Sequence, residues 1–138
     1  MRHVLVDTNV LLDVWLRREA GASAAVIKAG AEGTLRLYVT PVILANTHYF
    51  LAQMNKKEAA RSCDAFLDIA KVVSQPGDTL RQAFQSAWAD TEDAMHYFAA
   101  IKHDPRIGHL VTNNVKHFKL ASGLEVLSPE GFVAKYFQ

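Results

Sequence analysis

Six polar residues of this sequence carry side-chain oxygen atoms suited to metal binding, and most of them stand where apolar segments begin or end. The candidates are Asp7, Asn46, Asp90, Asp93, Thr112 and Asn114. Carboxylate and amide oxygens of this kind are ligands that Mg²⁺ and Mn²⁺ take in proteins. Such ions activate water and offset the charge of a phosphodiester during hydrolysis. The residue types therefore predict metal-assisted phosphodiester cleavage, on the condition that the fold brings these side chains together.

Asp7 stands at the junction between an expected strand and an expected helix. Residues 3–6 form an apolar run with β-branched members and no alternation, which is typical of a buried parallel strand. The apolar residues after Asn9 have helical spacing. A carboxylate at the end of such a strand lies where open α/β sheets bind ligands. Asp7 is also suited to cap the helix, and it stays free for a cation if Thr8 or Asn9 is the cap instead.

Three acidic residues open a second helix, expected over residues 91–102 with Asp90 as its N-cap. Asp90 and Asp93 are three residues apart, so their side chains fall on the same side, whereas Glu92 is expected to point elsewhere. Carboxylates in a first helical turn also complement the helix dipole without any further role. The cluster therefore has two interpretations, as ligands or as helix-stabilising charges.

The amides Asn46 and Asn114 complete the candidate set. Asn46 lies inside the apolar run of another expected helix, where an amide is either hydrogen-bonded in the core or exposed to a cleft. Thr112 and Asn114 follow a strand expected at residues 109–111. If this strand is parallel to the first one, Thr112 and Asn114 lie at the same edge of the sheet as Asp7.

Strands and helices alternate along the whole chain. We expect strands at residues 3–6, 35–39, 71–73, 109–111 and 126–127. Helices are expected at residues 10–18, 22–31, 41–51, 56–73 (running into the third strand), 79–88 and 91–102, with a short helix or turn at 115–120 and a last helix up to residue 137. Thr40 and Ser128 each precede a proline, which suits helix entry. The pattern predicts an α/β fold with a parallel or mostly parallel sheet covered on both faces.

The composition is that of an ordinary globular protein. Half of the 138 residues are hydrophobic and 21% are charged, and the length suits a single domain over residues 1–138. The net charge of +1 does not favour strong sequence-independent attraction to nucleic acid, although a local basic patch remains possible. A single cysteine, the lack of a signal peptide and the lack of a long apolar run lead us to expect a cytoplasmic protein without a membrane partner.

Three segments carry a family resemblance. They are Asp-Thr-Asn-Val-Leu-Leu-Asp at residues 7–13, Asp-Thr-Glu-Asp-Ala at 90–94 with the apolar residues that follow it, and Val-Thr-Asn-Asn-Val-Lys-His-Phe at 111–118. Together, and in this order, they resemble the conserved segments of PIN domains, most closely those of VapC-like toxins from toxin–antitoxin pairs. The resemblance spans nearly the whole chain.

The resemblance implies a three-layer α/β/α sandwich and a ribonuclease that depends on Mg²⁺ or Mn²⁺. It assigns catalysis and metal binding to Asp7, Asp93 and Asp90, adds Asn114 as a metal ligand, and gives supporting roles to Thr8, Asn9, Asn46 and Thr112. RNA is the expected substrate, Lys116, Lys119 and His117 are candidate RNA contacts, and an antitoxin protein is a possible partner. Those three side chains equally suit a solvated polar face.

Two positions depart from the family pattern. Asn46 stands where many PIN nucleases have glutamate, and Asn114 where many have aspartate. Amide oxygens ligate Mg²⁺ without offsetting its charge, so we expect weaker metal binding, one well-held ion, and low or conditional activity. The alternative is a PIN-like domain that has lost catalysis and binds nucleic acid or protein.

PIN toxins also resemble one another in forming dimers, and Phe132, Tyr136 and Phe137 are candidates for such a homodimer surface. The competing interpretation is that these aromatic residues, together with Trp15, Trp88, Tyr49 and Phe50, fill the core.

Overall fold

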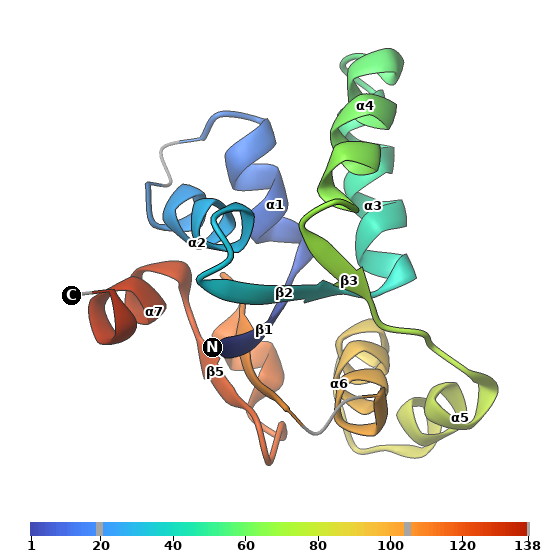
Figure 1. Cartoon of the computed structure of the whole chain (residues 1–138). Coiled ribbons are helices and arrows are strands. Elements are labelled where there is room, and N and C mark those ends of the chain that lie inside the picture. The colour runs from blue at the N-terminus through green and yellow to red at the C-terminus, as the bar shows by residue number, and fades with distance from the viewer. Residues whose placement is uncertain (19–20, 104–105, 138) are drawn as a thin grey trace.

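The computed structural model describes residues 1–18, 21–103 and 106–137. Its strands are β1 (Arg2–Val6), β2 (Leu35–Val39), β3 (Ala70–Val72), β4 (Ile107–Val111) and β5 (Glu125–Leu127). Its helices are α1 (Thr8–Trp15), α2 (Gly21–Ala31), α3 (Pro41–Ala52), α4 (Lys56–Phe66), α5 (Gly77–Gln85), α6 (Thr91–His103) and α7 (Pro129–Tyr136), with a short 3₁₀ helix η1 (Val115–Phe118) before β5. Figure 1 shows these elements in chain order.

The strands form one sheet in the order β3-β2-β1-β4-β5, and each neighbouring pair is parallel. The carboxyl ends of the strands therefore share one edge. Val6 at the end of β1 is in register with Val111 at the end of β4. The polar residues that follow these two strands, Asp7 and Thr112, are consequently neighbours at that edge.

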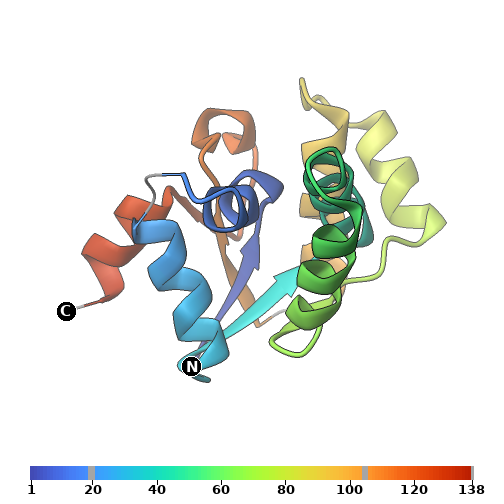
Figure 2. The same cartoon turned by 90° about the horizontal axis from the view of Figure 1, so that it is seen from above.

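Helices cover both faces of the sheet, which gives the expected three-layer α/β/α sandwich. Seen from above in Figure 2, α2 and α7 lie on one side of the strands, and α5 and α6 lie on the other. The helix α1 packs against α2 and α3, and α3 packs against α4. The α3–α4 pair projects away from the sheet in Figure 1. No helix in the described part of the chain is long and apolar enough to cross a membrane.

The central strand β1 shows why the sequence has an unbroken apolar run there. It lies between β2 and β4 and is covered on both faces, and Val4, Leu5 and Val6 are fully buried. A strand buried on both faces takes apolar residues in succession, whereas a strand with one wet face alternates. The same run ends at Asp7, so burial of β1 holds the first candidate acid in a rigid position.

Two expected caps are confirmed. The Thr40 hydroxyl accepts the Ile43 backbone N–H at 3.1 Å and begins α3. The Ser128 hydroxyl accepts the Gly131 N–H at 3.0 Å and begins α7. Each cap satisfies a backbone donor that the first turn of a helix leaves without a partner.

Several helix boundaries differ from expectation. The first helix ends at Trp15 rather than near residue 18, because Arg17 has a left-handed φ of 53°. The helix expected at 56–73 ends at Phe66, and the turn before β3 lies outside it. The helix expected at 79–88 runs over Gly77–Gln85, so it begins two residues earlier than expected, and Ser86 is extended at its end.

Most of the aromatic residues fill the core. Phe132 is fully buried, and Trp15, Trp88, Tyr136 and Phe137 pack against the main core. Tyr49 and Phe50 on α3 and Phe84 on α5 are exceptions, with exposed fractions of 62%, 50% and 67%. The C-terminal aromatic residues therefore pack within the chain itself and give no evidence for a dimer surface. The homodimer stays a prediction.

Candidate active site

An open pocket of about 310 Å³ lies at the carboxyl edge of the sheet. It is lined by Asp7, Thr8, Asn9, Leu12, Asn46, Phe50, Asp90, Glu92, Asp93, Asn114 and His117. These residues come from the starts of α1 and α6, from the middle of α3 and from the segment after β4. The fold thus brings to one pocket the acids and amides that the sequence singles out.

Asp7 both caps α1 and faces the pocket. Its Oδ1 accepts the Thr8 backbone N–H at 2.8 Å, and its Oδ2 accepts the Thr112 hydroxyl at 2.8 Å. The sequence left the cap open between Asp7 and Thr8 or Asn9, and the extended backbone at Asp7 makes it the cap. The Asn9 amide lies 3.4 Å from Asp7 Oδ2 and orders the same carboxylate. One carboxylate therefore has both of the roles that the sequence left open.

Asp90 and Asp93 open α6 together. The Asp93 backbone N–H donates to Asp90 Oδ1 at 3.0 Å, which makes Asp90 the cap that its position predicted. Asp93 is only 9% exposed. Burial, with the carboxylates of Asp7 and Asp90 nearby, raises the pKa of Asp93 from 3.8 to about 6, although His96 and His117 act in the opposite direction. Like charges are therefore crowded at the centre of the pocket.

Glu92 also faces this pocket, so the expectation that it points elsewhere is wrong. Its Oε1 accepts a hydrogen bond of 2.6 Å from the Asn46 amide on α3. The neighbouring His96 ring, and to a smaller extent Asn46, hold the pKa of the Glu92 carboxyl below its usual value against the effect of burial. The prediction used only the angular position of residue 92 around the helix. It did not take into account that the long glutamate side chain reaches across to α3.

Thr112 and Asn114 extend the polar wall after β4. Thr112 is fully buried, donates to Asp7 and accepts the Asn114 backbone N–H at 3.0 Å. Asn114 is exposed and lines the pocket, and its role as a metal ligand remains a prediction. Thr112 therefore acts on the pocket by fixing its two neighbours.

Of the three candidate RNA contacts, only His117 is among the residues that line the pocket. His117 lines the pocket, with its Nδ1 at 3.3 Å from Asp93 Oδ2 and half of its side chain exposed. Lys116 and Lys119 are exposed on and after η1 and do not line the pocket. RNA binding by these side chains remains a prediction.

Sequence reasoning missed His96, which lies beneath the acids. It is 1% exposed, and its Nδ1 is 2.9 Å from the Thr40 hydroxyl. One of its ring nitrogens and one carboxylate oxygen each of Asp7 and Asp93 lie within 4.8 Å of one another. The available signal was its position three residues after Asp93, which places both on one face of α6.

A second missed group holds the loop after β4 against α1. The Asp13 carboxylate accepts hydrogen bonds from the Ser23 hydroxyl at 3.0 Å and the Asn113 amide at 2.8 Å, both at Oδ2. The Asn113 backbone N–H donates to Asn9 Oδ1 at 3.0 Å. Asp13 is therefore a positioning residue for the pocket wall and lies outside the pocket lining.

The pocket fits a divalent cation. A second set of donors, from Asp90, Asp93 and His117, also lies within 4.8 Å of one another. Thr8 Oγ1 is buried beside the acids and has no hydrogen-bond partner among the described residues. Crowded carboxylates with an unsatisfied oxygen at their edge suit an ion with oxygen ligands.

The fold is similar to that of chains in three solved complexes. One of them is VapBC2 from Rickettsia felis, bound to a DNA fragment from its promoter. A chain of that complex is 18% identical to this one, with a TM-score of 0.65, and the match covers 91% of this chain and 98% of that one. A toxin–antitoxin complex from Klebsiella pneumoniae matches at 18% identity and a TM-score of 0.68, over 91% and 97% of the two chains. A chain of FitAB bound to the IR36 DNA fragment matches at 15% identity and a TM-score of 0.66, and the match covers 91% of this chain and 94% of that one.

The sequence comparisons complete the assignment. No curated protein matches the sequence significantly. The family model described as PIN domain matches residues 3–116, which is most of the chain and includes Asp7, Asp90, Asp93 and Asn114. The chain therefore belongs to the PIN domain family.

Proposed function

We propose that this PIN domain is a divalent-metal-dependent endoribonuclease and the toxin of a toxin–antitoxin pair. The observation that carries the proposal is the convergence of Asp7, Asp90, Glu92 and Asp93 on one pocket. Membership of a family whose members are generally nucleases supports it. The likeness to chains of toxin–antitoxin complexes motivates the antitoxin partner.

Asp7 and Asp93 are the residues we assign to hold Mg²⁺ or Mn²⁺, with Asp90 and Asn114 completing the ligand set. When bound, such an ion supplies a more acidic water and offsets charge on the scissile phosphate. Thr112 and the Thr8 backbone N–H fix the Asp7 carboxylate by hydrogen bonds of 2.8 Å each. A ligand held by a strand end and two hydrogen bonds loses little freedom when it binds.

The open side of the pocket receives the RNA in this proposal. His117 stands there beside Asp93 and is half exposed, so it is placed to contact a phosphate or the departing oxygen. Lys116 and Lys119 lie on either side of His117 in the sequence and add positive charge to the same short segment. Phosphate contacts from such side chains are electrostatic and weaken as salt rises.

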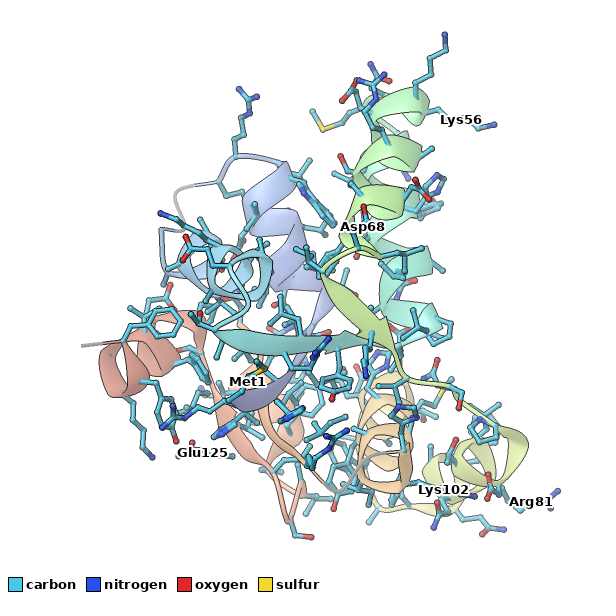
Figure 3. All side chains as sticks on the ribbon, in the orientation of Figure 1. Met1, Lys56, Asp68, Arg81, Lys102 and Glu125 are labelled. Carbon is cyan, nitrogen blue, oxygen red and sulfur yellow. The ribbon has the colours of Figure 1, made fainter. Side chains whose placement is uncertain are left out.

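A cleavage assay on total RNA tests the proposal. The wild-type chain is incubated with Mn²⁺, with Mg²⁺ or with EDTA, beside the variants Asp93→Asn and Asp68→Asn. Asp68 is a matched control, because it follows α4 and lines a pocket with Met1 and Leu35 at the opposite edge of the sheet. Figure 3 labels Asp68 and Met1. We expect cleavage by the wild type and Asp68→Asn, and none with EDTA or Asp93→Asn.

The same assay separates the nuclease from the binding-module alternative. Cleavage that persists in Asp93→Asn or in EDTA would come from another site or a contaminant, and would contradict the proposal. RNA that is bound but left intact by the wild type, with either ion at millimolar concentration, would favour a module that has lost catalysis.

A further inference from the structure

A buried histidine lies beneath the acidic pocket with one ring nitrogen left available. His96 is 1% exposed, and its Nδ1 lies 2.9 Å from the Thr40 hydroxyl. Its Nε2 is 3.9 Å from Glu92 Oε1, which is longer than a hydrogen bond. This nitrogen therefore lies beside the Glu92 carboxylate but beyond hydrogen-bond distance of it, and His96 is not itself among the residues that line the pocket.

We infer that His96 is a nitrogen ligand of the divalent ion, together with Asp7 and Asp93, and that this site prefers Mn²⁺ to Mg²⁺. The inference deepens the proposed function and rests on it for the presence of a metal ion. A ring nitrogen of His96 lies within 4.8 Å of a carboxylate oxygen of each aspartate, and these two oxygens are equally close to each other. Small movements of the side chains bring three such atoms around one cation.

The surroundings of His96 are those of a metal-binding histidine. Such a histidine donates its other ring N–H to a fixed acceptor, which sets the tautomer and the ring orientation. Here the Thr40 hydroxyl occupies that position and is itself fixed by the Ile43 backbone N–H at 3.1 Å. With Nδ1 turned to Thr40, Nε2 is the nitrogen that is left for an ion.

His117 is the competing nitrogen donor. Its Nδ1 lies 3.3 Å from Asp93 Oδ2, but half of its side chain is exposed. Fixing an exposed side chain on an ion costs conformational entropy, whereas His96 is already held by packing and by Thr40. The buried histidine is therefore the better ligand, and His117 stays free for substrate.

The donor type decides the metal preference. Mg²⁺ takes oxygen ligands at short, nearly ideal octahedral distances and keeps several waters. Imidazole nitrogen is a softer ligand, and it favours first-row transition metals over magnesium. The carboxylates of Asp7 and Asp93 and the imidazole of His96 consequently form a site with both oxygen and nitrogen ligands. We expect that replacing the nitrogen ligand by an oxygen ligand removes the preference for Mn²⁺.

Pulsed electron paramagnetic resonance of the Mn²⁺-loaded full chain tests the ligand directly. Nitrogen bound to Mn²⁺ modulates the electron spin echo, and labelling only the histidines with ¹⁵N changes that modulation without any substitution. We expect histidine nitrogen modulation in the wild type, its loss in His96→Gln, and its retention in His117→Gln. The labelled wild type keeps the test valid if His96→Gln folds poorly.

Calorimetry supplies the second readout. We expect His96→Gln to weaken Mn²⁺ binding by at least roughly tenfold, in line with the loss of a metal ligand, while Mg²⁺ binding changes by less than about twofold because the amide oxygen of glutamine suits magnesium. His117→Gln is the matched control, and we expect it to keep the wild-type ratio of Mn²⁺ to Mg²⁺ affinity.

The outcomes separate this inference from the proposed function. Bound Mn²⁺ without histidine modulation in the labelled wild type overturns the inference and leaves a metal nuclease with oxygen ligands. Modulation that disappears in His117→Gln instead of His96→Gln also overturns it. Failure of the wild type to bind Mn²⁺ at all, even with RNA present, overturns both.

Discussion

The Asn46 amide donates a hydrogen bond of 2.6 Å to Glu92 Oε1, which joins the middle of α3 to the first turn of α6. Many PIN nucleases have glutamate at position 46, so the sequence alone suggests that Asn46 costs the pocket one acid. A carboxylate does reach this wall of the pocket, but it comes from the neighbouring helix. The pocket therefore contains four acids, Asp7, Asp90, Glu92 and Asp93, and is less depleted of charge than Asn46 and Asn114 suggest.

Replacing Glu92 tests whether this carboxylate contributes to metal binding. We expect Glu92→Gln to weaken Mn²⁺ binding by roughly tenfold, because one fewer negative charge faces the cation. Isothermal titration calorimetry measures the effect. Glu130→Gln is the control, since Glu130 is exposed on α7 and outside the pocket lining. Equal affinities for the two variants would show that Glu92 only binds Asn46.

Removing the Asp93 charge should stabilise the metal-free protein at neutral pH. The pKa of Asp93 is raised to about 6, so between pH 4 and pH 6 the folded chain keeps a proton that the unfolded chain releases. Stability of the wild type therefore falls as pH rises through this range. We expect Asp93→Asn to raise the free energy of unfolding by about 1–3 kcal/mol at pH 7 and by little near pH 4.

Urea unfolding in EDTA across this pH range is the measurement, with Asp68→Asn as the exposed control. The stabilisation should also reverse with metal, because Mn²⁺ binds only the folded wild type and raises its midpoint. A difference between Asp93→Asn and the wild type that stays constant from pH 4 to pH 7 would show that charge crowding at Asp93 is not its cause.

Thr112 connects two parts of the pocket through one hydroxyl. It donates to Asp7 Oδ2 at 2.8 Å and accepts the Asn114 N–H at 3.0 Å. We expect Thr112→Val to lower the free energy of unfolding by about 1–3 kcal/mol, because both partners lose a buried hydrogen bond. Thr112→Ser keeps the hydroxyl and should be close to the wild type. Equal losses in the two variants would assign the effect to the methyl group.

Asp13 and Asn113 should be energetically coupled. The Asn113 amide donates to Asp13 Oδ2 at 2.8 Å and ties the loop after β4 to α1. A double-mutant cycle with Asp13→Ala and Asn113→Ala should give a coupling energy of about 0.5–2 kcal/mol. Pairing Asp13→Ala with Asp68→Asn, at the opposite edge of the sheet, should give a value near zero. Additive effects of Asp13 and Asn113 would exclude this connection as a support of the pocket.

The fold was largely predictable because its signals are local. The buried run of β1, the Thr40-Pro41 and Ser128-Pro129 helix entries and the alternation of strands and helices all appear in the structure as expected. Helix ends were less predictable. The first helix stops where Arg17 adopts a left-handed conformation, and no residue type near it, such as glycine, marks that position.

The candidate site was predictable where residues belong to a motif and unpredictable where contacts cross between elements. Asp7, Asp90 and Asp93 lie at helix starts and line one pocket. The Asn46–Glu92 hydrogen bond depends on the reach of a side chain between α3 and α6. His96 is significant only because Thr40, from another element, fixes its ring. Such pairs are set by tertiary packing, which the spacing within one helix does not contain.

The most direct measurement is a calorimetric titration of Mn²⁺ and Mg²⁺ into the wild type, Asp93→Asn and Asp68→Asn. We expect saturable Mn²⁺ binding by the wild type and Asp68→Asn, with weaker Mg²⁺ binding, and the loss of both in Asp93→Asn. Absence of binding by the wild type at millimolar metal, with RNA present, would contradict a metal nuclease centred on Asp7 and Asp93 and leave a binding module in its place.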